Sequence, residues 1–353
     1  MGHRWEWISV KVQAINKDFT KIELLFMKTR LPLLLIVSIA TIITSCNKDD
    51  TTASTTPPPP TDSLGVWQKI NTSDGSVYDI WFIDAANGCE ISSNGSISLS
   101  SDSGKTWQRK DTGVDNNYLF FYNNQYGFDI GVSSISITKT GGISWETKSA
   151  PTSINNTNPI FFTTPSTGYL SNGITLYKTT DTCNSWTSIM QGNIGAMYFT
   201  NPAKGYITWK HSDTVAMYAT DDSGRTFRQL GTTNVFASAI NFSFLQFVDS
   251  TTAYFTFSNQ LYKATDTGHI LTPVTIPPPT YSSITNDVIL DINFLSPSTG
   301  YLARGRVIYY TNDGGNSFTI SCKAASDVYA LYFVDANNGW AACADGSILR
   351  FKQ

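Results

Sequence analysis

Few side chains in this sequence are suited to catalysis or to metal binding. Of its 353 residues, three are His and five are Cys. Beyond residue 63 the only glutamates are Glu90 and Glu146, so hydrolysis by paired carboxylates would have to rely on aspartates. The sequence contains no nucleophile elbow, zinc-ligand spacing or phosphate-binding loop. We therefore expect a non-catalytic protein that holds no metal and no cofactor.

Cys46 is the cysteine whose surroundings predict a reaction. Lys28 and Arg30 precede an apolar run, residues 31–43, that is too short to span a bilayer comfortably. The run ends in Ile-Thr-Ser-Cys at residues 43–46, which resembles a bacterial lipobox. The alternative is an ordinary secretory signal with a chance cysteine. The resemblance implies an exported outer-membrane lipoprotein, held in the membrane by a lipid on Cys46.

The segments around this site have separate roles. The acidic tract at residues 47–50 resembles the signal that sends lipoproteins of Bacteroidetes-type bacteria to the cell surface. Residues 51–63 contain four consecutive prolines, which predict an extended tether. Residues 1–26 do not fit, because a lipoprotein signal should begin at its charged end; we interpret Met27 as the start, with a genuinely long leader as the alternative. The predicted segments are a mis-called start or extended leader (1–26), a signal peptide (27–45), the lipidated Cys46 with its tether (46–63) and a folded domain (64–353).

The folded domain repeats one pattern seven times. Each copy has a phenylalanine, a glycine six positions later and usually a second aromatic residue after the glycine. The copies begin at Phe82, Phe121, Phe162, Phe199, Phe247, Phe294 and Phe333, and the one at Phe247 has Ala253 in place of glycine. The repeat length is about 42 residues, the period of a four-stranded propeller blade. Alternating apolar runs beside each copy predict strands.

In the first six copies, a second pattern follows the glycine, or Ala253, by some 12–18 residues. Its clearest copy is SSDSGKTW at residues 100–107, and the spacing S/T-x-D-x-G-x-T/S-W/F resembles the Asp box of the BNR repeat. The aspartate is expected to accept backbone N–H bonds across a tight turn, the glycine to supply a positive φ and the aromatic ring to pack beneath the turn. Each copy has too few carboxylates for calcium. The residues expected in these structural roles are Asp102, Gly104, Trp107, Trp145, Asp181, Trp186, Asp222, Gly224, Phe227, Asp266, Asp313, Gly315 and Phe318.

The two ends of the domain complement each other. The last copy stops before its own Asp box and outer strand, whereas residues 65–70 look like the outer strand of the other copies. Donating this strand to the last blade would close the ring and leave no open sheet edge in that blade. We therefore predict an all-β fold with a single seven-bladed β-propeller, closed by its N-terminal strand.

Residues 64–353 resemble the BNR/Asp-box propellers, and most nearly the family of the photosystem II stability and assembly factor. The resemblance is specific for the fold and weak for function. The photosynthetic role is not carried over, because the basic groove of those factors has no counterpart among eight scattered arginines. Asp boxes also occur in sialidases and xyloglucan-cleaving hydrolases. Sialidases need three arginines on inner strands, and the xyloglucan enzymes use two propellers. Because of these requirements, a carbohydrate-active hydrolase is the alternative function and not the expected one.

Binding is the expected activity. In such propellers the connections opposite the Asp-box turns form the ligand face; we call this side the loop face. Its candidate residues here are Trp209, Lys210, His211, Tyr281, Arg304 and Arg306. An exposed Trp beside polar groups would suit a sugar or a peptide, the alternative being that Trp209 belongs to the blade core.

The expected partners follow from composition. A net charge of −3 argues against nucleic acid. The expected partners are the membrane, through Cys46, and a protein or glycan held by a monomeric propeller; a scaffold for assembling other envelope proteins is a third possibility. The other cysteines, Cys89, Cys183, Cys322 and Cys343, fall at unmatched positions of the repeats. We expect buried free thiols, although an exported compartment would permit disulfides.

Overall fold

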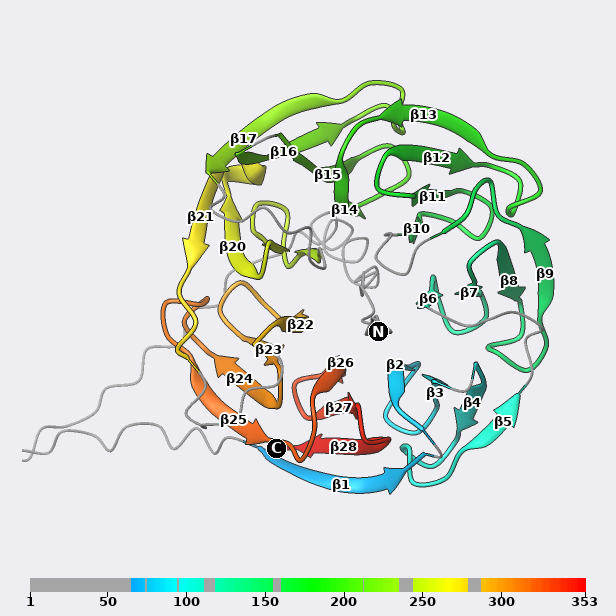
Figure 1. Ribbon diagram of the computed structural model, residues 1–353, viewed down its shortest axis with the longest axis vertical. Coiled ribbons are helices and arrows are strands. Elements are labelled where there is room, and N and C mark those ends of the chain that lie inside the picture. Colours follow the sequence, from blue (N-terminus) through cyan, green and yellow to red (C-terminus); the bar gives the residue numbers. More distant parts are fainter. Residues whose placement is uncertain are drawn as a thin grey trace, which may run out of the picture. The chain divides into compact units, whose positions relative to one another are not determined.

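The protein is represented by a computed structural model that describes residues 65–73, 75–93, 95–110, 118–154, 160–211, 213–234, 244–278 and 287–353. The predicted leader, signal peptide, Cys46 and tether lie outside the described residues. Seven four-stranded antiparallel sheets form a ring of blades, which confirms the predicted seven-bladed all-β propeller (Figure 1). The one helical element of this part of the chain is a 3₁₀ turn, Asp266–Gly268. No helix in the described ranges is long and apolar enough to cross a membrane.

Six blades are each built from four consecutive strands, with the first strand nearest the centre of the ring (Figure 1). Blades 1 and 2 comprise β2 Val77–Phe82, β3 Gly88–Ser92, β4 Ile97–Ser100, β5 Gln108–Lys110, β6 Tyr118–Phe121, β7 Gly127–Ile130, β8 Ser134–Thr138 and β9 Glu146–Ser149. Blades 3 and 4 comprise β10 Ile160–Phe162, β11 Gly168–Ser171, β12 Thr175–Thr179, β13 Thr187–Gln191, β14 Ile194–Phe199, β15 Gly205–Lys210, β16 Thr214–Thr220 and β17 Arg228–Asn234. Blades 5 and 6 comprise β18 Leu245–Phe247, β19 Ala253–Phe257, β20 Gln260–Thr265, β21 Ile270–Val274, β22 Ile289–Phe294, β23 Gly300–Arg304, β24 Val307–Thr311 and β25 Thr319–Lys323.

Blade 7 joins the two ends of the domain. Its strands β26 Val328–Asp335, β27 Asn338–Cys343 and β28 Ser347–Lys352 are completed by β1 Val66–Thr72, in the order β1-β28-β27-β26. In Figure 1 the blue β1 lies along the outer side of the red β28. Trp67 of β1 is opposite Phe351 in the register. The predicted closure by an N-terminal strand is confirmed.

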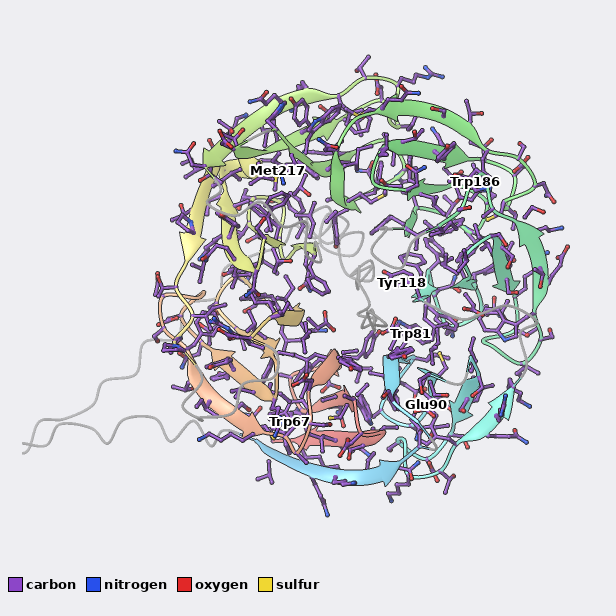
Figure 2. The ribbon with its side chains drawn as sticks, viewed as in Figure 1. Trp67, Trp81, Glu90, Tyr118, Trp186 and Met217 are labelled. Atoms are coloured by element: carbon purple, nitrogen blue, oxygen red, sulfur yellow. The ribbon has the colours of Figure 1, made fainter. Side chains whose placement is uncertain are left out.

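Trp67 ties the closing strand to its neighbours (Figure 2). Its ring centroid lies 5.3 Å from that of Phe351, 5.8 Å from that of Phe333 and 6.3 Å from that of Tyr301. The indole Nε1 donates a hydrogen bond of 2.9 Å to the Ser321 hydroxyl of blade 6. The closing strand therefore contributes to the apolar contacts between blades 6 and 7.

The aromatic residues of the repeat pair across the blade boundaries. In five junctions the ring that follows the glycine, or Ala253, stacks within 4.3 Å of the inner-strand phenylalanine of the next blade, at interplanar angles of 16° or less. Tyr206 and Phe247 make the same pair at 4.1 Å and 30°. The five pairs are Phe128–Phe162, Tyr169–Phe199, Tyr254–Phe294, Tyr301–Phe333 and Trp340–Phe82. Such contacts add to simple area burial, so each repeat binds the next one.

Blade 1 departs from this pairing. Cys89 follows its glycine, and Phe121 of blade 2 stacks on Trp81 of β2 instead, with 4.1 Å between centroids. The glycine itself is required for space: a Cβ on Gly88 would lie 2.6 Å from the Phe82 ring. Any side chain there would push the phenylalanine out of its stack.

Polar side chains on the inner strands also join neighbouring blades. Asp79 of β2 accepts the Leu119 amide of blade 2, and Asp291 of β22 accepts the Leu331 amide of blade 7, at 3.3 and 2.7 Å. Gln246 of β18 exchanges two hydrogen bonds with the backbone of Phe294. Because these side chains are at most 3% exposed, their polar groups need such partners.

Candidate functional site

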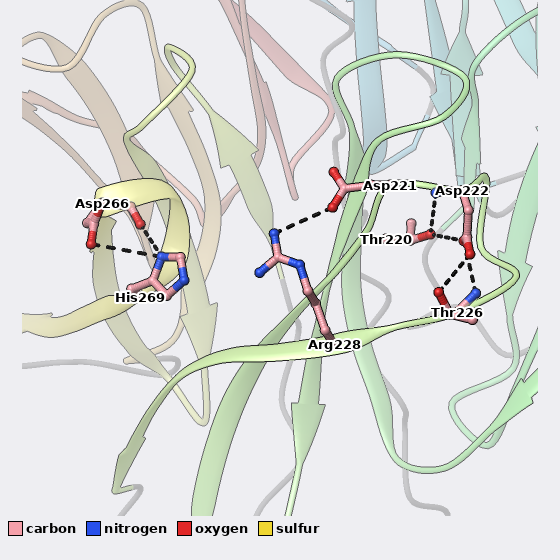
Figure 3. A network of polar contacts seen from close by, with 7 residues as sticks. All are labelled: Thr220, Asp221, Asp222, Thr226, Arg228, Asp266 and His269. Atoms are coloured by element: carbon pink, nitrogen blue, oxygen red, sulfur yellow. Dashed lines mark hydrogen bonds and ion pairs between the residues drawn. The ribbon is translucent and has the colours of Figure 1, made fainter.

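In the Asp boxes, hydrogen bonds to the aspartate carboxylate stabilise a tight turn (Figure 3). In blade 4, the Asp222 carboxylate accepts the Thr226 amide at 2.9 Å and the Thr226 hydroxyl at 2.6 Å. The Thr220 hydroxyl donates to the same carboxylate and accepts the amide of Gly224, whose φ is +80°. These hydrogen bonds, among which those from Thr226 have the largest effect, lower the pKa of Asp222 to about 2. The carboxylate is thus committed to the turn.

The clear copies repeat this geometry. Hydrogen bonds from the residue four positions on, Thr106 or Ser317, lower the pKa of Asp102 and Asp313 to about 2, and Ser185 likewise lowers the pKa of Asp181. Gly104 and Gly315 have positive φ. The indoles of Trp107 and Trp145 donate to the carbonyls of Gly104 and Gly142 in their own turns. Trp186, Phe227 and Phe318 pack against the core at the corresponding positions.

Blades 2 and 3 show how the turn tolerates substitution. Thr140, in place of the aspartate, accepts the Ser144 amide through its hydroxyl at 3.0 Å. Cys183, in place of the glycine, adopts a φ of 62° and its amide reaches the Thr179 hydroxyl.

Blade 5 departs furthest from the pattern. Asp266 begins the 3₁₀ turn, and its side chain is 71% exposed, 3.9 Å from the imidazole of His269 (Figure 3). The turn is closed by backbone instead, because the carbonyl of Asp266 accepts the His269 amide. The aspartate carboxylate therefore does not hold this turn as it does in the other copies.

The two glutamates of the domain lie in different environments. Glu90 of β3 is 2% exposed, and both carboxylate oxygens accept the Ser73 hydroxyl, at 2.8 and 3.0 Å. Burial raises the pKa of Glu90 to about 7. Glu146 is exposed on the outer strand β9, where the ammonium of Lys148 contacts it and lowers its pKa. The inner-strand carboxylates Asp79 and Asp291 hold backbone amides.

The turns divide between two sides of the ring. The amide of Ser103, in the Asp box of blade 1, donates to the carbonyl of Ala86, so the Asp boxes share a side with the turns between first and second strands. The turns between second and third strands, and the connections between blades, lie on the opposite side, the loop face. Trp209, Lys210 and His211 are at such a turn of blade 4.

Three side chains of blade 4 form an aromatic cluster, which we call the Trp209 cluster: Trp209, His211 and Tyr218. The Trp209 and Tyr218 ring centroids are 5.4 Å apart, and the imidazole of His211 is nearly parallel to the indole, at 14° and 6.2 Å. His211 Nε2 lies 3.3 Å from the Tyr218 hydroxyl, which donates to Gln229 Oε1 at 3.1 Å. Trp209 and Tyr218 are half-buried, and His211 and Gln229 are exposed.

The other candidates of the loop face are separated from this cluster. Lys210 points to the opposite side of the sheet, with its ammonium 5.9 Å from the Phe257 ring of blade 5. Arg304, in blade 6, makes a two-pronged ion pair with Asp287, at 2.6 and 2.9 Å, and Arg306 follows in the same turn. Tyr281 lies outside the described residues.

Two exposed aliphatic side chains on the loop face were missed by sequence reasoning. Val132 and Ile174 occupy the turns between second and third strands of blades 2 and 3, and are 45% and 65% exposed. Ile143 and Ile270 are 69% and 55% exposed in the Asp boxes of blades 2 and 5. The sequence signal was available for three of them, since Val132, Ile143 and Ile174 are aliphatic residues within turns, whereas Ile270 begins β21.

The cysteines and histidines form no metal site in the part of the chain that the structure describes. Cys89, Cys183, Cys322 and Cys343 are free thiols, of which Cys322 is half-buried and the others buried.

Comparison with known proteins supports the fold. Residues 60–207 match the family profile described as photosynthesis system II assembly factor YCF48. A structure of YCF48 bound to D1 peptide is 17% identical, with a TM-score of 0.61, over 82% of this chain and 95% of that one. YCF48 from Cyanidioschyzon merolae is 15% identical with a TM-score of 0.59, over 81% and 98% of the two chains. The chain is therefore a BNR-type propeller similar to the photosystem II assembly factor.

Other proteins share the fold. A GH74 xyloglucanase from Xanthomonas campestris is 12% identical with a TM-score of 0.59, over 80% of this chain and 53% of that one. The protein U3-55K is 8% identical with a TM-score of 0.62, over 81% and 98% of the two chains. A search of curated proteins gives no match. Since such distant likenesses show the fold alone, function must be argued from the site.

Proposed function

We propose that this BNR-type propeller is a non-catalytic module that binds an extended segment of another protein on its loop face. The observation that carries the proposal is the use of its carboxylates. The carboxylates of Asp79 and Asp291 accept hydrogen bonds from backbone amides of the neighbouring blade. The carboxylates of the clear Asp boxes accept hydrogen bonds within their own turns. Glu90 is buried and Glu146 is on an outer strand. A pair of carboxyl groups flanking a substrate, as glycosidases use, is not assembled from these side chains.

The likeness to YCF48 supports a protein ligand. That protein has been solved with a D1 peptide, and its fold covers most of this chain. A hydrolase is the alternative, since a xyloglucanase shares this fold over 53% of its own length. Apolar Val132 and Ile174 on the loop face suit protein contact, since exposed aliphatic groups gain by leaving water.

We further propose that the propeller is displayed on the cell surface as a lipoprotein. The signal-like residues 27–45 and the cysteine that follows them support export and lipidation. The proline-rich tether would hold the ring away from the membrane, because polyproline segments are extended.

The experiment that tests the binding role compares the two sides of the ring. A photo-crosslinking amino acid is placed singly at Val132 or Ile174 on the loop face, and at Ile143 or Ile270 among the Asp boxes. All four side chains are exposed, which makes the pairs matched controls. After irradiation of living cells, cross-linked products are isolated and identified by mass spectrometry.

We expect the same envelope protein at positions 132 and 174, and none at 143 and 270. Cross-links confined to the Asp-box side would overturn the assignment of the loop face. Products at none of the four positions, together with hydrolysis of xyloglucan by the purified chain, would replace the binding role with the hydrolase alternative.

A further inference from the structure

Glu90 places a carboxyl group at a position that most other blades fill with an apolar side chain. It is the second residue after the repeat glycine of blade 1, and it is 2% exposed (Figure 2). Blade 2 has Asp129 at this position. In blades 3 to 7 the position is apolar and 0% exposed, occupied by Leu170, Ile207, Phe255, Leu302 and Ala341. The blade architecture therefore does not require a carboxyl group here.

The side chain of Glu90 faces the junction at which the ring closes. Its neighbours in β3, Cys89 and Ile91, belong to the apolar cluster shared with blade 2. Because alternate residues of a strand face opposite sides of the sheet, Glu90 faces blade 7. Blade 7 is the blade that combines strands from both ends of the domain.

Ser73 joins Glu90 to blade 7. Its hydroxyl donates to the two carboxyl oxygens of Glu90, at 2.8 and 3.0 Å, and its amide donates to the Gly346 carbonyl of blade 7 at 2.8 Å. The Ser76 hydroxyl donates to the Ala344 carbonyl in the same turn of blade 7. We call Ser73, Ser76, Gly346 and Glu90 the seam.

Two other blades make the same backbone contact without a carboxyl group. Ala150 follows the outer strand β9 and its amide donates to the Ser133 carbonyl at 3.0 Å; Ala324 follows β25 and its amide donates to the Arg306 carbonyl at 2.8 Å. An alanine has no hydroxyl to reach the next blade, and the residue at the Glu90 position of that blade is apolar. These two contacts are therefore natural controls for the seam.

Charged side chains do not compensate a negative charge on Glu90 within the described part of the chain. Burial raises its pKa to about 7, opposed by hydrogen bonds from the hydroxyls of Ser73 and Ser98. Asp79 accepts an amide of blade 2, and Arg350 lies over a tryptophan ring of its own blade. The ionisable groups on the elements around Glu90, none of which alters its pKa, are Lys69 of β1, Tyr78 and Asp79 of β2, Cys89 of β3, Tyr329, Tyr332 and Asp335 of β26, Cys343 of β27, Asp345 of the following turn, and Arg350 and Lys352 of β28.

We propose that a proton on Glu90 keeps the seam closed and that loss of this proton opens it. An ionised Glu90 is a buried charge held by hydroxyl groups alone, and it gains by reaching water. It reaches water when Ser73 and Ser76 leave their contacts with blade 7. The register between β1 and β28 is irregular between Lys69 and Asn71, so the end of β1 beside the seam is the part of this strand that is paired least regularly.

The direction and size of the pH dependence follow from linkage. With the seam open, the hydrated carboxyl group ionises near its ordinary pKa of 4.5, whereas with the seam closed it keeps its proton up to about pH 7. The equilibrium constant for opening therefore rises as the pH increases from 4.5 to 7 and is constant above that range. At tenfold per pKa unit, the increase between pH 4.5 and 7.5 is about a hundredfold.

Amide hydrogen exchange of the full chain in detergent measures this opening, because a bonded amide exchanges when its hydrogen bond opens. Mass spectrometry with electron-transfer fragmentation resolves single amides, and each rate is corrected for the intrinsic exchange rate at that pH. The protection of the Ser73 amide should fall about a hundredfold between pH 4.5 and 7.5. The amides of Ala150 and Ala324 should keep their protection.

Variants of Glu90 identify the group responsible. Glu90→Gln, and Glu90→Leu with the residue that blades 3 and 6 carry, should keep the protection of Ser73 constant over this range, and the pair keeps the test valid if one variant does not fold. Glu146→Gln should retain the wild-type fall. Constant protection of Ser73 in the wild type, or an equal fall in Glu90→Gln, would overturn the proposal. So would an equal fall at Ala150 and Ala324, because the whole ring and not the seam would then be responding.

Discussion

Replacing Glu90 by glutamine should make the propeller more stable at neutral and alkaline pH. Glu90 is 2% exposed in blade 1, and its carboxyl group accepts the hydroxyl of Ser73, the residue that follows the closing strand β1. Burial, opposed by hydrogen bonds from Ser73 and Ser98, raises its pKa from 4.5 to about 7. The folded chain therefore holds this proton more tightly than the unfolded chain does.

The size and pH range of the effect follow from that pKa. Below pH 4.5 the Glu90 carboxyl group is protonated in both the folded and the unfolded chain, and its contribution to the free energy of unfolding is fully present. As the pH rises from 4.5 to 7 the unfolded chain ionises first, so the folded state loses stability, by about 3 kcal/mol in all at about 1.4 kcal/mol per pKa unit. Glu90→Gln cannot ionise and should escape this loss. The free energy of unfolding of the variant should match that of the wild type near pH 4.5 and exceed it by about 3 kcal/mol above pH 7.

Urea unfolding of both chains between pH 4 and 8.5 measures the difference in free energy. Glu146→Gln is the matched control: it removes the exposed glutamate, whose pKa is lowered by Lys148, and should keep the wild-type fall between pH 4.5 and 7. Parallel pH profiles for wild type and Glu90→Gln would refute the reasoning, because they would mean that Glu90 ionises in the folded chain as it does in the unfolded one.

Three further outcomes are expected. Deleting residues 64–70 should lower the free energy of unfolding by at least about 3 kcal/mol, because a packed tryptophan and the strand that covers β28 are lost. As the control, a chain that lacks only residues 1–63 should have the same thermal midpoint as the intact chain. Equal thermal midpoints for the two truncated chains would contradict closure by β1. Asp222→Ala should lower the thermal midpoint by removing the bonds to the following turn, whereas Asp266→Ala, whose carboxylate does not hold its turn, should leave it unchanged. Cys46→Ala should release the protein from membranes, because the lipid is the predicted anchor; a variant that stays with the membrane pellet after a salt wash would disprove lipidation.

The blade count and the closure of the ring could be predicted from the sequence because they are properties of a local, repeated pattern. The phenylalanine-to-glycine spacing recurs every 42 residues or so, and the missing strand of the last copy is present at residues 65–70. The Asp-box turns were equally accessible, since each is closed within about eight residues. Val132, Ile143 and Ile174 also lie in turns, but their exposure was not recognised from the sequence.

The environment of Glu90 could not be predicted from the sequence. Ser73 lies 17 residues away and follows the strand that completes blade 7. Ser73 lies in the connection from β1 to β2, where its amide donates to the Gly346 carbonyl of blade 7 and its hydroxyl donates to Glu90 of blade 1, so this environment combines groups from both ends of the ring. In the same way, the role of the aromatic residue after the repeat glycine required its partner in the next blade, which lies 30 to 41 residues further on, or at the other end of the domain in the pair Trp340–Phe82.

Two of the candidate ligand residues, Trp209 and Lys210, lie on opposite sides of the blade 4 sheet because of strand geometry. Trp209 and Lys210 are adjacent in the sequence, but alternate side chains of a strand face opposite sides of the sheet, and in a propeller these sides belong to different neighbours. Trp209 therefore meets Gly192 at the connection from blade 3, and Lys210 meets Phe257 of blade 5. Sequence alone determined that an aromatic and polar turn exists in blade 4. Tertiary structure decided which of its side chains act together, because closing the ring sets which blade covers each face.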